Sequence, residues 1–106
     1  MLAKERNMFQ GRRFITQGVG DTIPLEVQMF LWSLLDNLVE KKVVELDYIQ
    51  VFELLGESGK QQIIHRQEEP HYQAVYQFDN VLNPLHSKLY VIDDGGHSTM
   101  LLCDEY

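Results

Sequence analysis

The chain contains little cysteine and no long hydrophobic run. Its one cysteine, Cys103, cannot form a disulfide within the chain, nor can it alone build a thiolate zinc cluster. No apolar segment reaches the ~20 residues of a membrane-spanning helix, and residues 1–13 lack the apolar core of a secretory signal. With 44% apolar and 24% charged residues, the composition is that of a globular chain. We therefore expect a soluble, cytoplasmic protein with no membrane association.

Basic residues are scarce beyond the N-terminus. Residues 1–13 contain four basic side chains and one glutamate, a net charge of +3, whereas the rest contains five basic and fifteen acidic residues, a net charge of −10. A fold this acidic repels phosphates, so we expect no direct binding to nucleic acid. The same charge suits attraction of a basic partner, and one alternative function is an acidic nucleic-acid mimic that binds a host protein.

The segment GDTIPLEVQMFLWSLLDNLVEKK predicts one long amphipathic helix. Asp21 and Thr22 are capping types, Pro24 suits the first turn, and Lys41 and Lys42 suit the last turn. The apolar arc of this helix covers more than half of its circumference, which is wider than the ~100° stripe that one core contact requires. Either the sheet curls around the helix, or a second chain covers its flank to form a homodimer. The side chains expected to contact that second chain are Trp32, Phe30, Leu35 and Val39.

Most other segments show the alternation that is typical of strands. We expect strands at about 13–19, 46–54, 61–67 and 71–78, followed by two more in LYVIDDGGHSTMLLCDEY. Short connections favour antiparallel pairing. The predicted fold class is α+β: one long amphipathic helix packed on a mostly antiparallel sheet of five to six strands. We interpret residues 1–12 as a basic, flexible leader and residues 13–106 as a single α+β domain.

The paired glycines at 95–96 are expected to form the tip of a hairpin between the last two strands. In this register Asp94 faces His97. Adjacent strand residues point to opposite faces, so His97 cannot readily act as the base for Ser98, and Cys103 lies roughly 20 Å along the strand. The hairpin therefore predicts no catalytic residue, and it leaves Asp94 and His97 as a charge pair.

The same pair is also half of a metal site. A metal would need further ligands from other segments, and His65 and His71 have suitable atoms although their spacing matches no metal motif. One alternative function is therefore a metal-dependent hydrolase that uses Asp94 and His97 with these histidines. The leading interpretation includes no catalytic residue, no metal and no cofactor.

Four segments resemble a known family. TIPLEVQMFLW, LDYIQVFEL, IIHRQEEPHY and VIDDGGHSTMLLCDEY occur in the order found in the short bacterial proteins catalogued as domain of unknown function 960, over about residues 13–106. The resemblance implies a small cytosolic protein of Firmicutes and their mobile elements, and it brings no established activity, cofactor or catalytic residue. Our leading hypothesis is a non-catalytic protein-interaction or regulatory module, with an unknown protein partner.

Overall fold

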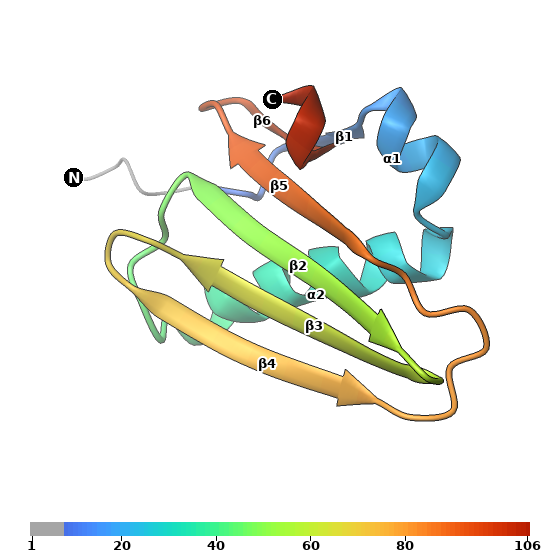
Figure 1. Ribbon diagram of the computed structural model, residues 1–106. Helices are drawn as coiled ribbons and strands as arrows, with labels where there is room; N and C mark the ends of the chain where they lie inside the picture. Colours follow the sequence, from blue (N-terminus) through green and yellow to red (C-terminus); the bar gives the residue numbers. More distant parts are fainter. Residues whose placement is uncertain (1–7) are drawn as a thin grey trace.

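The computed structural model describes residues 8–106. In chain order its elements are β1 (Arg12–Ile15), α1 (Gln17–Thr22), α2 (Leu25–Lys41), β2 (Ile49–Glu57), β3 (Lys60–Gln67), β4 (Tyr72–Phe78), β5 (Ser87–Asp93), β6 (His97–Leu102) and the short 3₁₀ helix η2 (Cys103–Glu105). The strands form one sheet, and α2 lies across one of its faces (Figure 1). The predicted α+β class is therefore confirmed.

The six strands stand in the order β1-β6-β5-β2-β3-β4, which places β1 and β4 at the two edges. β2 pairs antiparallel with β3 and β5, β3 pairs antiparallel with β4, and β5 pairs antiparallel with β6. The first and last strands, β1 and β6, pair in parallel. The sheet is therefore mixed, because β1 joins the rest through helices and not through a hairpin that would force antiparallel pairing.

The N-terminal strand is shorter than the sequence pattern suggested. It ends at Ile15, because the Thr16 side chain caps a helix by accepting a hydrogen bond from the Val19 N–H at 3.3 Å. Residues 21–22, expected to cap the long helix, belong to α1 instead, and Pro24 occupies the N-cap position of α2. The expectation of one strand over 13–19 was therefore wrong.

The last part of the expected leader belongs to the fold. Residues 1–7 lie outside the described residues, but Phe9 is fully buried and packs in the hydrophobic core. Its backbone N–H donates to Asp93 Oδ1 at 3.1 Å. The folded part therefore begins before residue 13, because the core uses the Phe9 ring.

The core lies between α2 and the central strands. Four leucines of α2 are buried, and they belong to the same side of the helix: Leu31, Leu34, Leu35 and Leu38. Opposite them, β2, β5 and β6 contribute Phe52, Leu54, Leu89, Val91 and Met100, all at 0% exposure. Each such side chain contributes roughly 1.5–3 kcal/mol through burial. The outer surface of α2 is not uniformly polar, since Leu25 and Met29 are 67% and 61% exposed.

The two flanks of α2 meet opposite parts of the same sheet. On one flank the Phe30 ring lies edge-on to Tyr76 and Phe78 of β4, with centroid distances of 5.8 and 5.4 Å. On the other, the Arg13 guanidinium lies 4.7 Å from the centroid of the Trp32 ring. Within residues 8–106, these contacts cover the helix flanks with the protein's own strands.

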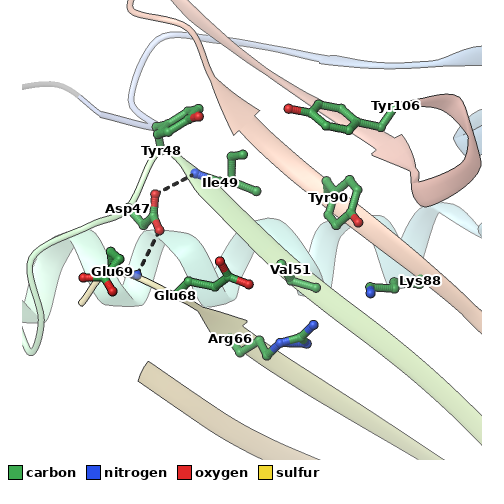
Figure 2. A pocket seen from close by; sticks show the side chains of 10 residues that line it. All are labelled: Asp47, Tyr48, Ile49, Val51, Arg66, Glu68, Glu69, Lys88, Tyr90 and Tyr106. Carbon is green, nitrogen blue, oxygen red and sulfur yellow. Dashed lines mark hydrogen bonds between the residues drawn. The ribbon is translucent and has the colours of Figure 1, made fainter. Parts of the chain in front are cut away.

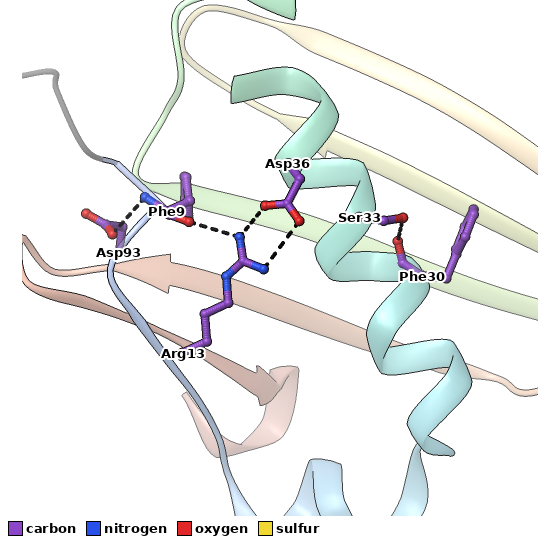
Figure 3. Close-up of polar contacts among 6 residues, drawn as sticks. All are labelled: Phe9, Arg13, Phe30, Ser33, Asp36 and Asp93. Atoms are coloured by element: carbon purple, nitrogen blue, oxygen red, sulfur yellow. Dashed lines mark hydrogen bonds and ion pairs between the residues drawn. The ribbon is translucent and has the colours of Figure 1, made fainter. Parts of the chain in front are cut away.

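Arg13 also joins the N-terminal segment to α2 (Figure 3). Its guanidinium donates to the Phe9 carbonyl oxygen at 3.0 Å and forms an ion pair with Asp36. The Asp36 side chain is 59% exposed, so solvent screens this pair and it contributes little stability by itself. None of the helices within residues 8–106 combines the length and the apolar character needed to cross a bilayer.

Gly56 of β2 packs against the segment that leads into β5, and this contact leaves no room for a side chain. A Cβ there would lie 2.6 Å from the Pro84 Cβ and 2.9 Å from the Leu85 carbonyl oxygen. Gly56→Ala is therefore expected to lower the free energy of unfolding by roughly 1–3 kcal/mol, measured by urea denaturation with Trp32 fluorescence.

Gly20→Ala is the matched control, because a Cβ there would meet only Ile15 Cδ1, at 3.5 Å. This helical position should gain about 0.5–1 kcal/mol from alanine. Equal stability of the two variants would contradict the close contact at Gly56.

Candidate functional site

The sheet face that points away from α2 carries a hollow (Figure 2). Successive strand residues point to opposite faces of the sheet. The centre of this face is therefore formed by the strand residues that lie between the core residues in the sequence. We call it the open face, and its central side chains are Ile49, Val51, Arg66, Lys88 and Tyr90. The hollow encloses a volume of about 410 Å³, and Tyr106 at the C-terminus borders it.

Three tyrosines give the hollow its aromatic character. Tyr90 and Tyr106 lie edge to face with their ring centroids 5.5 Å apart. Tyr48 and Tyr106 are 55% and 74% exposed, so both rings are accessible from solvent. Desolvation, with a further contribution from the neighbouring Cys103 thiol, raises the pKa of Tyr90. The Tyr90 hydroxyl therefore stays protonated at neutral pH and can donate a hydrogen bond.

Charged groups of opposite sign lie at different sides of the hollow (Figure 2). Arg66 of β3 and Lys88 of β5 lie on the same side of the hollow. The Lys88 Nζ is 5.9 Å from the Tyr90 ring centroid. The Arg66 guanidinium is 3.6 Å from the Glu53 carboxylate. Glu68 and Glu69, in the turn after β3, lie on the other side. A ligand in the hollow would therefore meet basic groups, acidic groups and tyrosine rings at different parts of the lining.

The acidic side of the hollow is held in place by Asp47. Its carboxylate accepts hydrogen bonds from the backbone N–H groups of Ile49 and Glu69, at 3.4 and 3.1 Å (Figure 2). These bonds connect the start of β2 to the turn after β3. Asp47 is therefore engaged within the fold, and its neighbours Glu68 and Glu69 are exposed.

The C-terminus is fastened by Glu105. Its carboxylate accepts hydrogen bonds from the Thr16 hydroxyl at 2.6 Å, the Leu102 N–H at 2.8 Å and the Gly18 N–H at 3.2 Å. These bonds, the one from Thr16 foremost, lower the pKa of Glu105. Because Tyr106 directly follows Glu105 in the chain, these hydrogen bonds position the Tyr106 side chain beside the hollow.

The β5–β6 hairpin confirms the predicted pairing of the last two strands. Asp93 lies opposite Ser98, and the Asp94 N–H donates to the His97 carbonyl oxygen at 3.0 Å. The Asp94 carboxylate lies 3.0 Å from His97 Nε2, so the predicted pair is present. Asp93 accepts a backbone hydrogen bond from Gly95 at 3.2 Å. The carboxylates of this hairpin therefore have structural partners.

The other histidines proposed as metal ligands lie elsewhere. His65 is fully buried on the face that packs on α2, where it stacks on Phe52 at 4.4 Å, whereas His97 lies on the opposite face. His71 is exposed in the turn between β3 and β4. Among residues 8–106, no three side chains of histidine, cysteine, aspartate or glutamate group closely enough to hold a metal ion.

The side chains predicted to form a helix interface are mostly covered. Leu35 is fully buried against the sheet. Phe30, Trp32 and Val39 are half-buried and pack at the margin of the core. The structure therefore does not bring these four residues together on one free surface, because the leucine faces inward while Phe30 and Trp32 lie on opposite flanks of α2.

A buried polar network lies beneath the acidic side of the hollow, and the sequence analysis missed it. The Gln50 amide donates to Gln67 Oε1 at 2.7 Å and to the Asp47 carbonyl oxygen at 2.8 Å. The Gln67 amide donates to the carbonyl oxygens of Glu45 and Pro70, at 2.9 and 2.7 Å. Strand alternation places both glutamines on the apolar face of the sheet. Their positions in this alternating pattern could have identified them from the sequence.

His65 completes this network. With the Gln50 amide nitrogen engaged elsewhere, Gln50 Oε1 accepts from His65 Nε2 at 2.7 Å. His65 Nδ1 is buried without a hydrogen-bond partner among the described residues. Burial lowers the pKa of His65 from 6.5 to about 4, so the ring is neutral at neutral pH. The fold therefore depends on an uncharged imidazole at this position.

The neutral state of His65 predicts acid-sensitive stability. Between pH 6.5 and about 4 the unfolded chain binds a proton at this ring and the folded chain does not, so stability is lost as pH falls through this window. The loss should approach about 3 kcal/mol, measured by urea denaturation across that range. The His65→Gln variant should lose this part of the dependence of the unfolding free energy on pH. The His71→Gln variant, changed at an exposed histidine, should retain it. Identical pH slopes in all three proteins would contradict the neutral, buried ring.

Comparisons with known proteins identify one similar solved structure and one matching family. The crystal structure of a protein of unknown function from Enterococcus faecalis is similar to this chain, with a TM-score of 0.75 and 26% identity over 91% of each chain. The comparison with curated proteins gave no match. A family model described as "Staphylococcal protein of unknown function (DUF960)" matches residues 12–105, from the first strand to η2. The chain therefore belongs to the DUF960 family, as its four sequence segments had indicated.

Proposed function

We propose that this protein is a non-catalytic protein-interaction module whose partner binds the hollow on the open face. The observation that carries the proposal is the joint presence of three tyrosines with Arg66 and Lys88 on a sheet face that α2 leaves uncovered. Tyrosine and arginine are enriched at protein interfaces, because each combines a large apolar surface with hydrogen-bond donors.

The exposure of the lining favours a protein over a small molecule. Tyr48 and Tyr106 are more than half exposed, whereas pockets for small molecules bury most of the ligand surface. Exposed tyrosines at the margin can instead close over a polypeptide segment and exclude water from it. The arrangement of charges suits a segment with acidic side chains toward Arg66 and Lys88 and basic side chains toward Glu68 and Glu69.

The alternative functions have weaker support. A mimic of nucleic acid requires acidic groups alone on its binding face, but Arg66 and Lys88 lie on this one. A metal-dependent hydrolase requires converging ligands, and His65 faces the core while Asp94 and His97 lie at the β5–β6 hairpin. We propose the cytoplasm as the location, supported by the presence of a single cysteine in the chain.

Removal of the two most exposed tyrosines tests the proposal. The double variant Tyr48→Ser/Tyr106→Ser should keep its fold, because both side chains are more than half exposed. Proteins captured from the extract of a bacterium that encodes this chain should be recovered at least tenfold less by the variant, corresponding to about 1.4 kcal/mol of binding free energy. Quantitative mass spectrometry, followed by titration of each captured protein in purified form, measures the loss.

Leu25→Ser/Val43→Ser is the matched control, since these side chains are 67% and 66% exposed away from the hollow. It should retain the partners that wild-type protein captures. Recovery of the same proteins by both double variants would refute binding at the hollow, and the absence of any reproducible partner of the wild-type chain would refute the proposal as a whole.

A further inference from the structure

β4 forms an edge of the sheet without the features that usually protect an edge. Among residues 8–106 it pairs with β3 alone. Its sequence, YQAVYQF, contains no charged residue and no proline, whereas natural edge strands commonly carry charges, proline or a bulge that prevent pairing with another chain. β1, at the other edge, has four residues and includes Arg12 and Arg13. Of the two edges of the sheet within the described residues, β4 alone presents a long, uncharged one.

The turn between β2 and β3 determines which backbone groups face outward. Ser58 and Gly59 have positive φ angles of 50° and 77°, as a two-residue hairpin requires. The residue pair that closes such a hairpin is hydrogen-bonded, so the next residue of β3, Gln61, directs its N–H and C=O groups toward β4. Its partner Phe78, and each second residue of β4 before it, are therefore bonded to β3.

The remaining residues of β4 point their backbone groups away from the sheet. These residues are Gln73, Val75 and Gln77, and their side chains are exposed on the open side of the strand. They are arranged symmetrically about Val75, which is the middle residue of the seven-residue strand. A strand with this symmetry can pair with a copy of itself.

We infer that β4 pairs with β4 of a second copy of this chain in an antiparallel, two-fold ladder centred on Val75. Val75 then lies opposite Val75 of the second copy, and Gln73 lies opposite Gln77 of the second copy. Each outward N–H and C=O of these residues gains a partner, as in an ordinary antiparallel ladder. The interface is isologous, which is the usual form in homodimers.

The side chains of β4 are complementary to themselves in this register. Tyr72 lies opposite Phe78 of the second copy as an aromatic pair, and the small Ala74 lies opposite Tyr76 of the second copy, which leaves room for the Tyr76 ring. Just beyond the strand, His71 lies beside Asp79 of the second copy. The chain already contains an imidazole–carboxylate pair of this kind, with 3.0 Å between its two groups, at the β5–β6 hairpin.

Other registers are less favourable. A ladder centred on Gln73 would pair only residues 72–74 with strand residues of the second copy, and it would place Gln77 opposite Glu69 in the turn before β4. A ladder centred on Gln77 would leave most of β4 unpaired. Of these three registers, the one centred on Val75 pairs the most residues of β4.

This inference is independent of the proposed function, because β4 does not line the hollow. A two-fold axis perpendicular to the joined sheets would place both hollows on the same side of the dimer. A partner with two binding segments would then gain avidity without any new contact.

Replacement of Val75 tests the interface. Val75 is 51% exposed, so lysine or glutamate should be tolerated in the monomer. The chain mass is 12.4 kDa, and wild-type protein should sediment with twice that mass at micromolar concentrations. Val75→Lys and Val75→Glu should each weaken dimerisation roughly tenfold or more, because like charges would lie directly opposite each other. Val43→Lys, at a site 66% exposed outside β4, should remain dimeric.

A mixture of the two charged variants separates loss of the interface from loss of the fold. Val75→Lys and Val75→Glu, each monomeric alone, should combine into a one-to-one heterodimer, because lysine then faces glutamate. Formation of that heterodimer supports the β4 ladder. A monomeric wild type, an unchanged dimer in either charged variant, or failure of the mixture to associate would overturn it, whatever the result for the tyrosine variants at the hollow.

Discussion

One helix lies against a sheet that is wider than the helix. This difference in width determines which parts of the sheet are covered and which stay at the surface. Six strands at about 4.8 Å spacing span about 24 Å, whereas a helix with its side chains is about 10–12 Å across. α2 therefore covers the centre of one face, where Phe52 and Leu89 are fully buried. Phe30 and Trp32 extend the contact toward opposite edges. The second face and the outer edge of β4 stay at the surface, which is where binding can occur.

The two faces of the sheet are connected through buried amides. Gln50, His65 and Gln67 lie on the core side, but the backbone carbonyl groups that the two glutamines bind belong to the segments before β2 and after β3. Those segments carry Glu68 and Glu69 to the hollow on the other side. An amide left unsatisfied in the core would cost about 1–3 kcal/mol, so the network holds these segments in one arrangement. Polar groups in the core thus position charged groups at the surface.

The similarity to the Enterococcus faecalis structure concerns the scaffold. A TM-score of 0.75 with 26% identity means that the arrangement of strands and helix is shared while most side chains differ. A shared scaffold does not specify a shared ligand, because recognition depends on surface residues. We propose that the open face and the β4 edge are the parts of the molecule that give this chain its specificity.

The sequence by itself determined the features that depend on neighbouring residues. Alternation in residues 72–78 predicted a strand, and the paired glycines at 95–96 predicted the register of the last hairpin, because side-chain period and turn geometry are local properties. Tertiary structure decided the rest. The parallel pairing of β1 with β6, the burial of Phe9 and the inward orientation of His65 all depend on segments far apart in the chain. Strand order is set by such long-range contacts, and strand order determines which face and which edge remain open to a partner.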